Sequence, residues 1–127
     1  MATQVDLWGD IGPAEPVRTP VTILREQAAL LGRKTKNVLE AKVSSFTLAG
    51  GLTHSFNIVV PGLDDYTYEL FQIQIGVDAY PVFVSVPPTM ATVKLETEQQ
   101  FTEWLKAKLS SPETKKIIGN LLAQATT

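Results

Sequence analysis

The sequence is poor in the residues that most often carry chemistry. It contains no cysteine and one histidine, His54, in 127 residues. The absence of cysteine excludes disulfide bonds, thiolate catalysis and cysteine-ligated zinc or iron. A single histidine provides no pair at metal-ligand spacing, and the carboxylates do not follow the pattern of a calcium loop. We therefore expect neither a metal site nor a cofactor.

Long hydrophobic runs are also absent. No apolar stretch approaches the roughly 18 residues of a membrane-spanning helix, and the N-terminus lacks the basic start and apolar core of a signal peptide. Hydrophobic residues make up 44% and charged residues 19% of the chain, as in an ordinary globular protein. We expect a cytoplasmic protein that makes no contact with a membrane.

Basic residues are unevenly distributed. Residues 43–93 contain no lysine or arginine, residues 1–17 contain three acids and no base, and residues 18–42 contain six bases. The net charge is −2, whereas nucleic-acid-binding proteins usually carry a basic surplus. The Gly50-Gly51 pair is not a phosphate loop, because no lysine and no helix follow it. The expected partner is therefore a protein or a second copy of the chain, and nucleic acid is disfavoured.

Residues 1–18 have the composition of an extended arm, with several glycines and prolines and no periodic apolar pattern. Leu7 and Trp8 are its prominent apolar groups. One interpretation is a flexible terminus whose Trp8 lies in a neighbouring groove. The other is an arm that exchanges with, or binds to, a partner. Residues 19–127 are expected to form a single domain.

Three segments have the pattern of amphipathic helices. The first begins at Thr19-Pro20, a cap followed by a proline at the first helical position, and is expected to end at Gly32. The second follows a capping box at 97–100, and the third begins at Ser111-Pro112. Gly119, within the third, costs about 1 kcal/mol relative to alanine. This glycine indicates either close packing or a weak final helix.

Between the first two helices, apolar and polar residues alternate in segments that are separated by turn residues. The expected strands are 38–48, 52–60, 66–77 and 82–86, with 92–95 as a short fifth strand. Hairpin connections favour an antiparallel meander. The predicted fold class is α+β, with an N-terminal helix, a four- or five-stranded antiparallel sheet and two C-terminal helices packed on one sheet face.

Alternation along 66–77 places Phe71 and Ile73 towards the helices and leaves the opposite sheet face available for contact. We expect that face to be neutral and polar. The residues predicted to form an interaction face there are Asn57, Tyr66, Tyr68, Leu70, Gln72 and Gln74. On this prediction, Tyr68→Ala and Gln72→Glu weaken binding or dimerisation with little loss of stability.

Catalysis has little support in the sequence. No nucleophile-elbow pattern surrounds Ser55 or Ser85, the serines weighed as partners of His54. We favour a Glu69 that is exposed to water at an open strand end, or paired with a base of a helix. The alternative follows from its strand parity with Phe71, and is a carboxylate that points to the apolar side and serves as an acid or base. We assign no catalytic residue and name His54 and Glu69 as candidates for lining a pocket.

The function predicted from these patterns is a non-enzymatic protein-interaction module. The candidate classes are an inhibitor, an immunity protein or a chaperone-like partner of bacteria or phages. A homodimer built sheet on sheet would use the same face. The alternative is a small-molecule-binding domain, or a small enzyme, with a pocket between sheet and helices.

Overall fold

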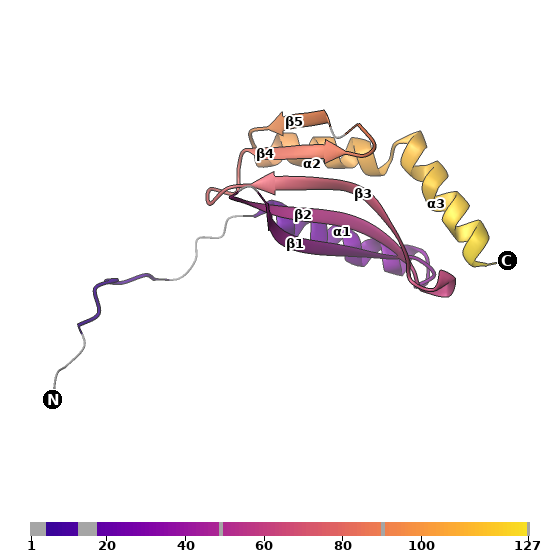
Figure 1. Cartoon of the computed structure of the whole chain (residues 1–127), viewed down its shortest axis with the longest axis horizontal. Coiled ribbons are helices and arrows are strands. Elements are labelled where there is room, and N and C mark those ends of the chain that lie inside the picture. Colours follow the sequence, from indigo (N-terminus) through magenta and orange to yellow (C-terminus); the bar gives the residue numbers. More distant parts are fainter. Residues whose placement is uncertain (1–4, 13–17, 49, 90, 127) are drawn as a thin grey trace.

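A computed structural model describes residues 5–12, 18–48, 50–89 and 91–126 of the chain. The arm predicted at 1–18 therefore lies partly outside the described residues. Figure 1 shows the order of the helices and strands. They are α1 (Pro20–Lys34), β1 (Glu40–Leu48), β2 (Gly51–Val60), the short 3-10 helix η1 (Pro61–Leu63), β3 (Tyr66–Ile75), β4 (Val82–Val86), β5 (Ala91–Leu95), α2 (Glu98–Leu109) and α3 (Pro112–Ala125).

The strands form one sheet in the order β1-β2-β3-β4-β5, and each neighbouring pair is antiparallel. Each strand therefore follows its neighbour in the chain, which is a meander. The α+β class, the antiparallel meander and the two C-terminal helices are confirmed. β3 ends at Ile75 instead of Val77, because Val77 is fully exposed and lies in the turn that follows.

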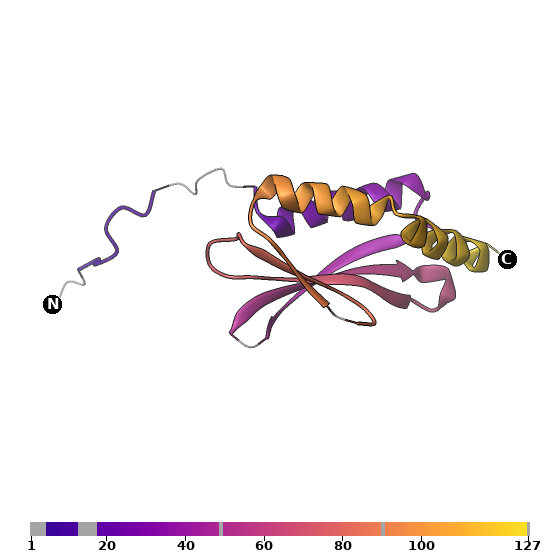
Figure 2. The same cartoon turned by 90° about the horizontal axis from the view of Figure 1, so that it is seen from above.

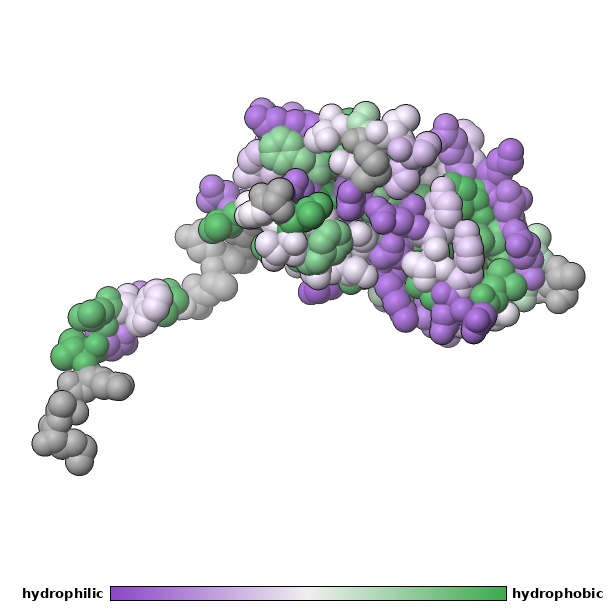
Figure 3. Space-filling view, viewed as in Figure 1, coloured by the Kyte–Doolittle hydropathy of each residue, from purple (hydrophilic) through white to green (hydrophobic). Residues whose placement is uncertain are grey.

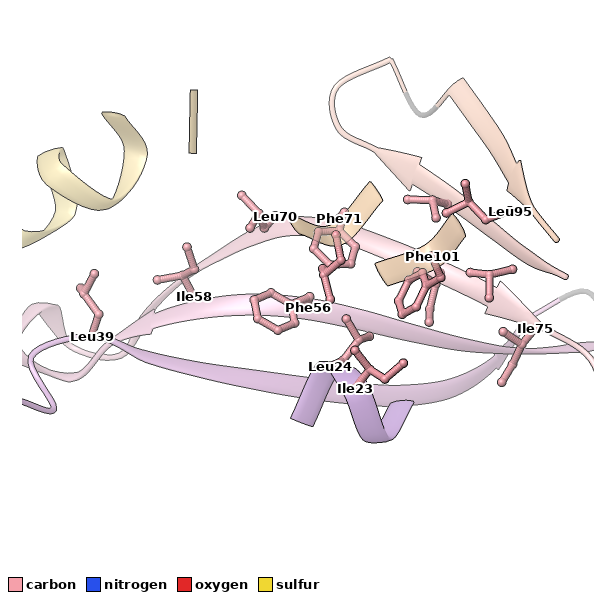
Figure 4. Close-up of a cluster of buried hydrophobic side chains, with 14 of the residues drawn as sticks. Ile23, Leu24, Leu39, Phe56, Ile58, Leu70, Phe71, Ile75, Leu95 and Phe101 are labelled. Carbon is pink, nitrogen blue, oxygen red and sulfur yellow. The ribbon is translucent and has the colours of Figure 1, made fainter. Parts of the chain in front are cut away.

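The three helices lie on the same side of the sheet (Figure 2). Between these layers, the rings of Phe56 and Phe71 stack with their centroids 5.2 Å apart, and Trp104 of α2 meets Phe71 edge to face at 5.0 Å. Phe101 of α2 is fully buried in the same cluster (Figure 4). The removal of these side chains from water is the main force that holds the helices on this face.

The helix starts agree with the sequence patterns. Thr19, Thr97 and Ser111 cap α1, α2 and α3, and each hydroxyl accepts a hydrogen bond from the backbone amide three residues later, at 3.3, 3.1 and 3.2 Å. Gln100 adds a contact to the second cap by accepting a hydrogen bond from the amide of Glu96 at 2.7 Å. These bonds satisfy amides that a helix leaves unpaired at its start.

The first helix ends later than predicted. α1 continues past Gly32 to Lys34. The hydroxyl of Thr35 donates to the carbonyl of Leu31 at 3.0 Å and accepts from the amide of Leu39 at 3.2 Å. Because this one side chain joins the end of α1 to the residue before β1, Thr35 and not Gly32 marks the stop.

A β-bulge divides β3. Phe56 of β2 faces Phe71, but the next residue, Asn57, faces Glu69, so Leu70 is an extra residue on β3. Side chains alternate between the two faces of a strand, and one extra residue shifts the alternation by one position. Tyr68 therefore faces the helices, as Phe71 does, and Leu70 is 2% exposed within the core.

Gly119 of α3 has open space around it, because a methyl group at its position would meet no atom within 4 Å apart from its chain neighbours and the backbone of its own helix. Close packing therefore does not explain this glycine. We expect Gly119→Ala to raise the free energy of unfolding by about 0.5–1 kcal/mol, since alanine loses less chain entropy in a helix. At Gly32, an added methyl would lie 3.3 Å from Asn37 Oδ1, so Gly32→Ala should gain less. Denaturant unfolding measures both, and a loss of stability in Gly119→Ala would contradict this packing.

Candidate functional site

The sheet face opposite to the helices is not covered by any described element (Figure 2), and we call it the open face. Residues that pair across neighbouring strands lie on the same face. One row of such partners crosses all five strands and consists of Ser44, Ser55, Gln72, Ser85 and Thr92. Every member is a neutral hydroxyl or amide. Figure 3 views this face and shows hydrophilic side chains across its middle.

The adjacent row of the open face carries two aromatic rings. It consists of Phe46, Thr53, Gln74, Phe83 and Lys94. Phe46 and Phe83 are 41% and 37% exposed. Lys94, on the edge strand β5, carries the only charge in these two rows. The centre of the open face therefore offers neutral polar groups beside exposed rings.

Thr53 lies recessed between larger neighbours on this face. It is 2% exposed, and its hydroxyl oxygen has no hydrogen-bond partner among the described residues. Thr53 borders a recess of about 60 Å³ whose lining includes Gln72, Phe83 and Ser85. A buried hydroxyl that lacks a partner costs about 1–3 kcal/mol. A hydrogen bond from a bound molecule would recover part of that free energy.

The side chain of Gln74 is fixed across the sheet. Its Nε2 donates to the carbonyl of Leu48 at 3.2 Å. The amide lies over Gly51, where a methyl group would come within 2.5 Å of Nε2. Glycine at this position therefore leaves room for the amide, and Gln74 gives the open face a defined shape next to the turn between β1 and β2.

Three of the predicted interaction residues lie together on the open face. Asn57, Gln72 and Gln74 alternate with the core residues of β2 and β3. The amide of Asn57 donates to Ser44 Oγ at 3.4 Å, which links β2 to the edge strand β1 on the open face. Their role in binding stays a prediction.

The other three predicted interaction residues do not share that face. Tyr68 packs against the core and Leu70 belongs to it, because the bulge reverses the alternation that the prediction assumed. Tyr66 pairs with the buried Val60, is 50% exposed, and lies beside Leu121 of α3. The predicted grouping of these residues with Gln72 and Gln74 is corrected accordingly.

The two pocket candidates, His54 and Glu69, lie on opposite faces of the sheet. His54 pairs with Ile73 on the helix side and is 6% exposed. Glu69 pairs with Asn57 and faces the open side, contrary to the orientation predicted from parity with Phe71. They therefore line no common pocket.

His54 has a hydroxyl partner that sequence reasoning missed. Its Nδ1 lies 2.7 Å from Ser45 Oγ, directly across the β1–β2 pairing. Ser55, weighed as its partner, is on the other face. Burial lowers the pKa of His54 below 6.5, and the positive charge of Arg25 lowers it further. Neither ion pair among the described residues involves His54, so a carboxylate that would orient the ring, as in a catalytic triad, is not part of this arrangement.

A second hollow lies between the sheet and the helices, and we call it the α1–α3 groove. Its volume is about 300 Å³, and its floor is formed by Phe56, Ile58 and Leu70. The remaining lining comes from the second half of α1, the end of α2 and α3, and includes Leu30, Leu31, Lys34, Leu109, Thr114 and Ile118. The groove is therefore apolar with one cation on its border, and neither His54 nor Glu69 lines it.

No protein-family model, curated protein or solved structure matches this chain. Within the described ranges, no cluster of three or more histidine, cysteine, aspartate or glutamate side chains could hold a metal ion. None of the helices described has the length and hydrophobicity required to cross a membrane. The interactions that both candidate sites offer are hydrogen bonds and apolar contact.

The bulge predicts opposite responses at two neighbouring positions of β3. Tyr68→Ala should lower the free energy of unfolding by about 1–3 kcal/mol, because Tyr68 packs against the core. Gln72→Glu should change it by less than about 0.5 kcal/mol, because Gln72 lies on the open face. Urea unfolding measures both values. If both variants changed the free energy of unfolding equally and by little, Tyr68 and Gln72 would lie on the same face of an unbroken strand, which would contradict the bulge.

His54 should make stability depend on pH. Its folded pKa lies below 6.5, so as the pH falls through about 6.5 the unfolded chain takes up a proton that the folded chain does not. Unfolding is then favoured. We expect the wild type to lose stability more steeply than His54→Asn between about pH 7 and pH 5. Chemical unfolding of both proteins at pH 7 and at pH 5 tests this. The titration of carboxylates affects both proteins equally, so the difference between them reports on His54. Equal losses of stability in the two proteins would refute the prediction.

Proposed function

We propose that the protein is a non-enzymatic interaction module that binds a protein partner through its open face. The observation that supports this most directly is the row of neutral polar side chains that crosses all five strands where no described helix covers the sheet. Phe46 and Phe83 add exposed apolar area on either side of Thr53. Interface centres are depleted of charge and enriched in aromatic residues.

Desolvation favours this face over the rest of the surface. Neutral hydroxyl and amide groups cost less to remove from water than ionised side chains do. The charged groups of the sheet's open face lie outside its centre, where they would form the rim of an interface; they are Glu40, Lys42, Glu69 and Lys94. The unpaired hydroxyl of Thr53 provides one buried hydrogen-bonding group that a partner would satisfy.

The proposed classes are an inhibitor, an immunity protein or a chaperone-like partner of bacterial or phage origin that acts in the cytoplasm. The absence of cysteine supports a reducing compartment. A homodimer joined open face to open face is the version of the same proposal in which the partner is a second copy.

A second candidate function is the binding of a small apolar molecule in the α1–α3 groove. Its support is the groove itself, with a volume of about 300 Å³ and an apolar floor. Lys34 on its border favours a ligand that carries an anionic group.

Charge placed at the centre of the open face tests the proposed function. Gln72→Glu should weaken binding of the partner about tenfold or more, because the new carboxylate must lose its water in the interface. Affinity capture on the immobilised wild type identifies the partner, and titration with the purified partner gives the affinities. Light scattering shows whether the partner is a second copy.

Gln124→Glu is the matched control, because it makes the same chemical change on the exposed surface of α3. It should bind the partner as the wild type does. If Gln72→Glu and Gln124→Glu both bind normally, the open face is the wrong surface.

A further inference from the structure

The N-terminal arm exposes a dense set of large apolar side chains. Within its described residues, Val5, Leu7, Trp8 and Ile11 are 75%, 89%, 83% and 77% exposed. Val5 and Ile11 extend the apolar pair that the sequence analysis singled out. A patch of this kind on a chain segment is unfavourable in water and is typical of a binding element.

Two aspartates give the arm a local shape. Asp6 accepts a hydrogen bond from the amide of Trp8 at 2.9 Å, and Asp10 accepts one from the amide of Gly12 at 3.0 Å. Such turns restrict the chain around Trp8 before it meets a partner, which lowers the entropy cost of docking. The carboxylates also make the arm acidic, since residues 1–17 contain no base.

The α1–α3 groove complements the arm in polarity and in charge. Its floor and walls are largely apolar, and Leu30, at its edge, is 37% exposed. Lys34 lies on its border and Arg33 is beside it in the basic last turn of α1. The arm is acidic and carries an indole ring, whereas the groove is apolar and has a basic border, so the two are complementary.

The arm and the groove lie at opposite ends of α1. The helix has 15 residues, which corresponds to a length of about 22 Å. Just before the helix cap, Arg18 forms an ion pair with Glu26 of α1, and the carbonyl of Arg18 accepts a hydrogen bond from the hydroxyl of Tyr80 at 3.1 Å. In Figures 1 and 2 residues 5–12 extend from the end of the molecule that is opposite to α3. The large apolar side chains of residues 5–12 are exposed and do not occupy the groove of their own chain, which favours a groove on another molecule.

We infer that residues 5–12 of one copy dock in the α1–α3 groove of a second copy. Two copies then form a dimer with reciprocal arms, which is a closed, two-fold arrangement. Trp8 is the anchor that leaves water, and Asp6 or Asp10 meets the basic border. The open faces of both copies stay free, so this dimer is compatible with the proposed function and does not depend on it.

Two variants of the full chain test the arm and the groove separately. Leu7→Ser combined with Trp8→Ser removes the anchor, and Leu30→Glu places a carboxylate in the groove wall against the acidic arm. Each should raise the dissociation constant of the dimer about tenfold or more in sedimentation equilibrium. Ala29→Glu, an exposed neighbour on α1 that does not line the groove, is the matched control and should leave the dimer unchanged.

Mixing the two variants gives the decisive result. The arm variant keeps an intact groove and the groove variant keeps an intact arm. A mixture should therefore form a heterodimer with one arm docked, at concentrations where each variant alone is monomeric. The fluorescence of Trp8 is the difference between the emission spectra of the wild type and of Trp8→Phe. In the dimer this emission should shift to the blue and be shielded from quenching by acrylamide. This signal and the dimer should appear at the same protein concentration.

Several outcomes would overturn the inference. A monomeric chain with Trp8 shielded at every concentration would mean that the arm docks in its own groove. A monomeric chain with Trp8 exposed, up to about 100 μM, would leave the groove to a small apolar ligand or to another protein. A dimer that survives both variants but dissociates in Gln72→Glu would be joined through the open face, in support of the proposed function alone.

Discussion

The structure depends on the single extra residue that the bulge inserts in β3. Without it, a strand that begins Tyr66-Thr67-Tyr68 and ends with Phe71, Ile73 and Ile75 would turn its two apolar halves to opposite faces. With Leu70 as the additional residue, both halves face the helices. The polar residues on either side of the bulge, Glu69 and Gln72, then share the open face. One sheet thus acquires a continuous core on one side and an open face with a neutral centre on the other.

The elements of the fold were accessible from the sequence because local signals determine them. Hydroxyl caps at Thr19, Thr97 and Ser111 fix the helix starts, and period-two alternation with turn residues between the segments identifies the strands. Hairpin connections then leave few topologies other than a meander. The sequence predicts the end of α1 too early, because a glycine such as Gly32 commonly follows the last residue of a helix. Thr35 has the decisive hydrogen bonds, and they involve a residue that lies beyond the helix.

The open face could be predicted as a surface but not as a list of residues. The parity of the apolar positions changes between Leu70 and Phe71, and two adjacent apolar residues at such a change are the signal of a bulge that alternation alone overlooks. The contact of Ser45 with His54 depends on the β1–β2 register, which a single sequence does not specify. The α1–α3 groove depends on how three helices are spaced, and that follows from side-chain packing across distant segments.

The chain presents a polar open face and an apolar α1–α3 groove. Both exist because the helices and the core lie on one side of the sheet. The absence of native cysteine allows this arrangement to be measured with single introduced thiols. In the folded Glu69→Cys and Gln72→Cys variants, a maleimide should label the introduced thiol readily at either position, because the bulge turns both positions to the open face. In an unbroken strand, residues three apart face opposite sides, so protection of position 69 together with rapid labelling of position 72 would contradict the account.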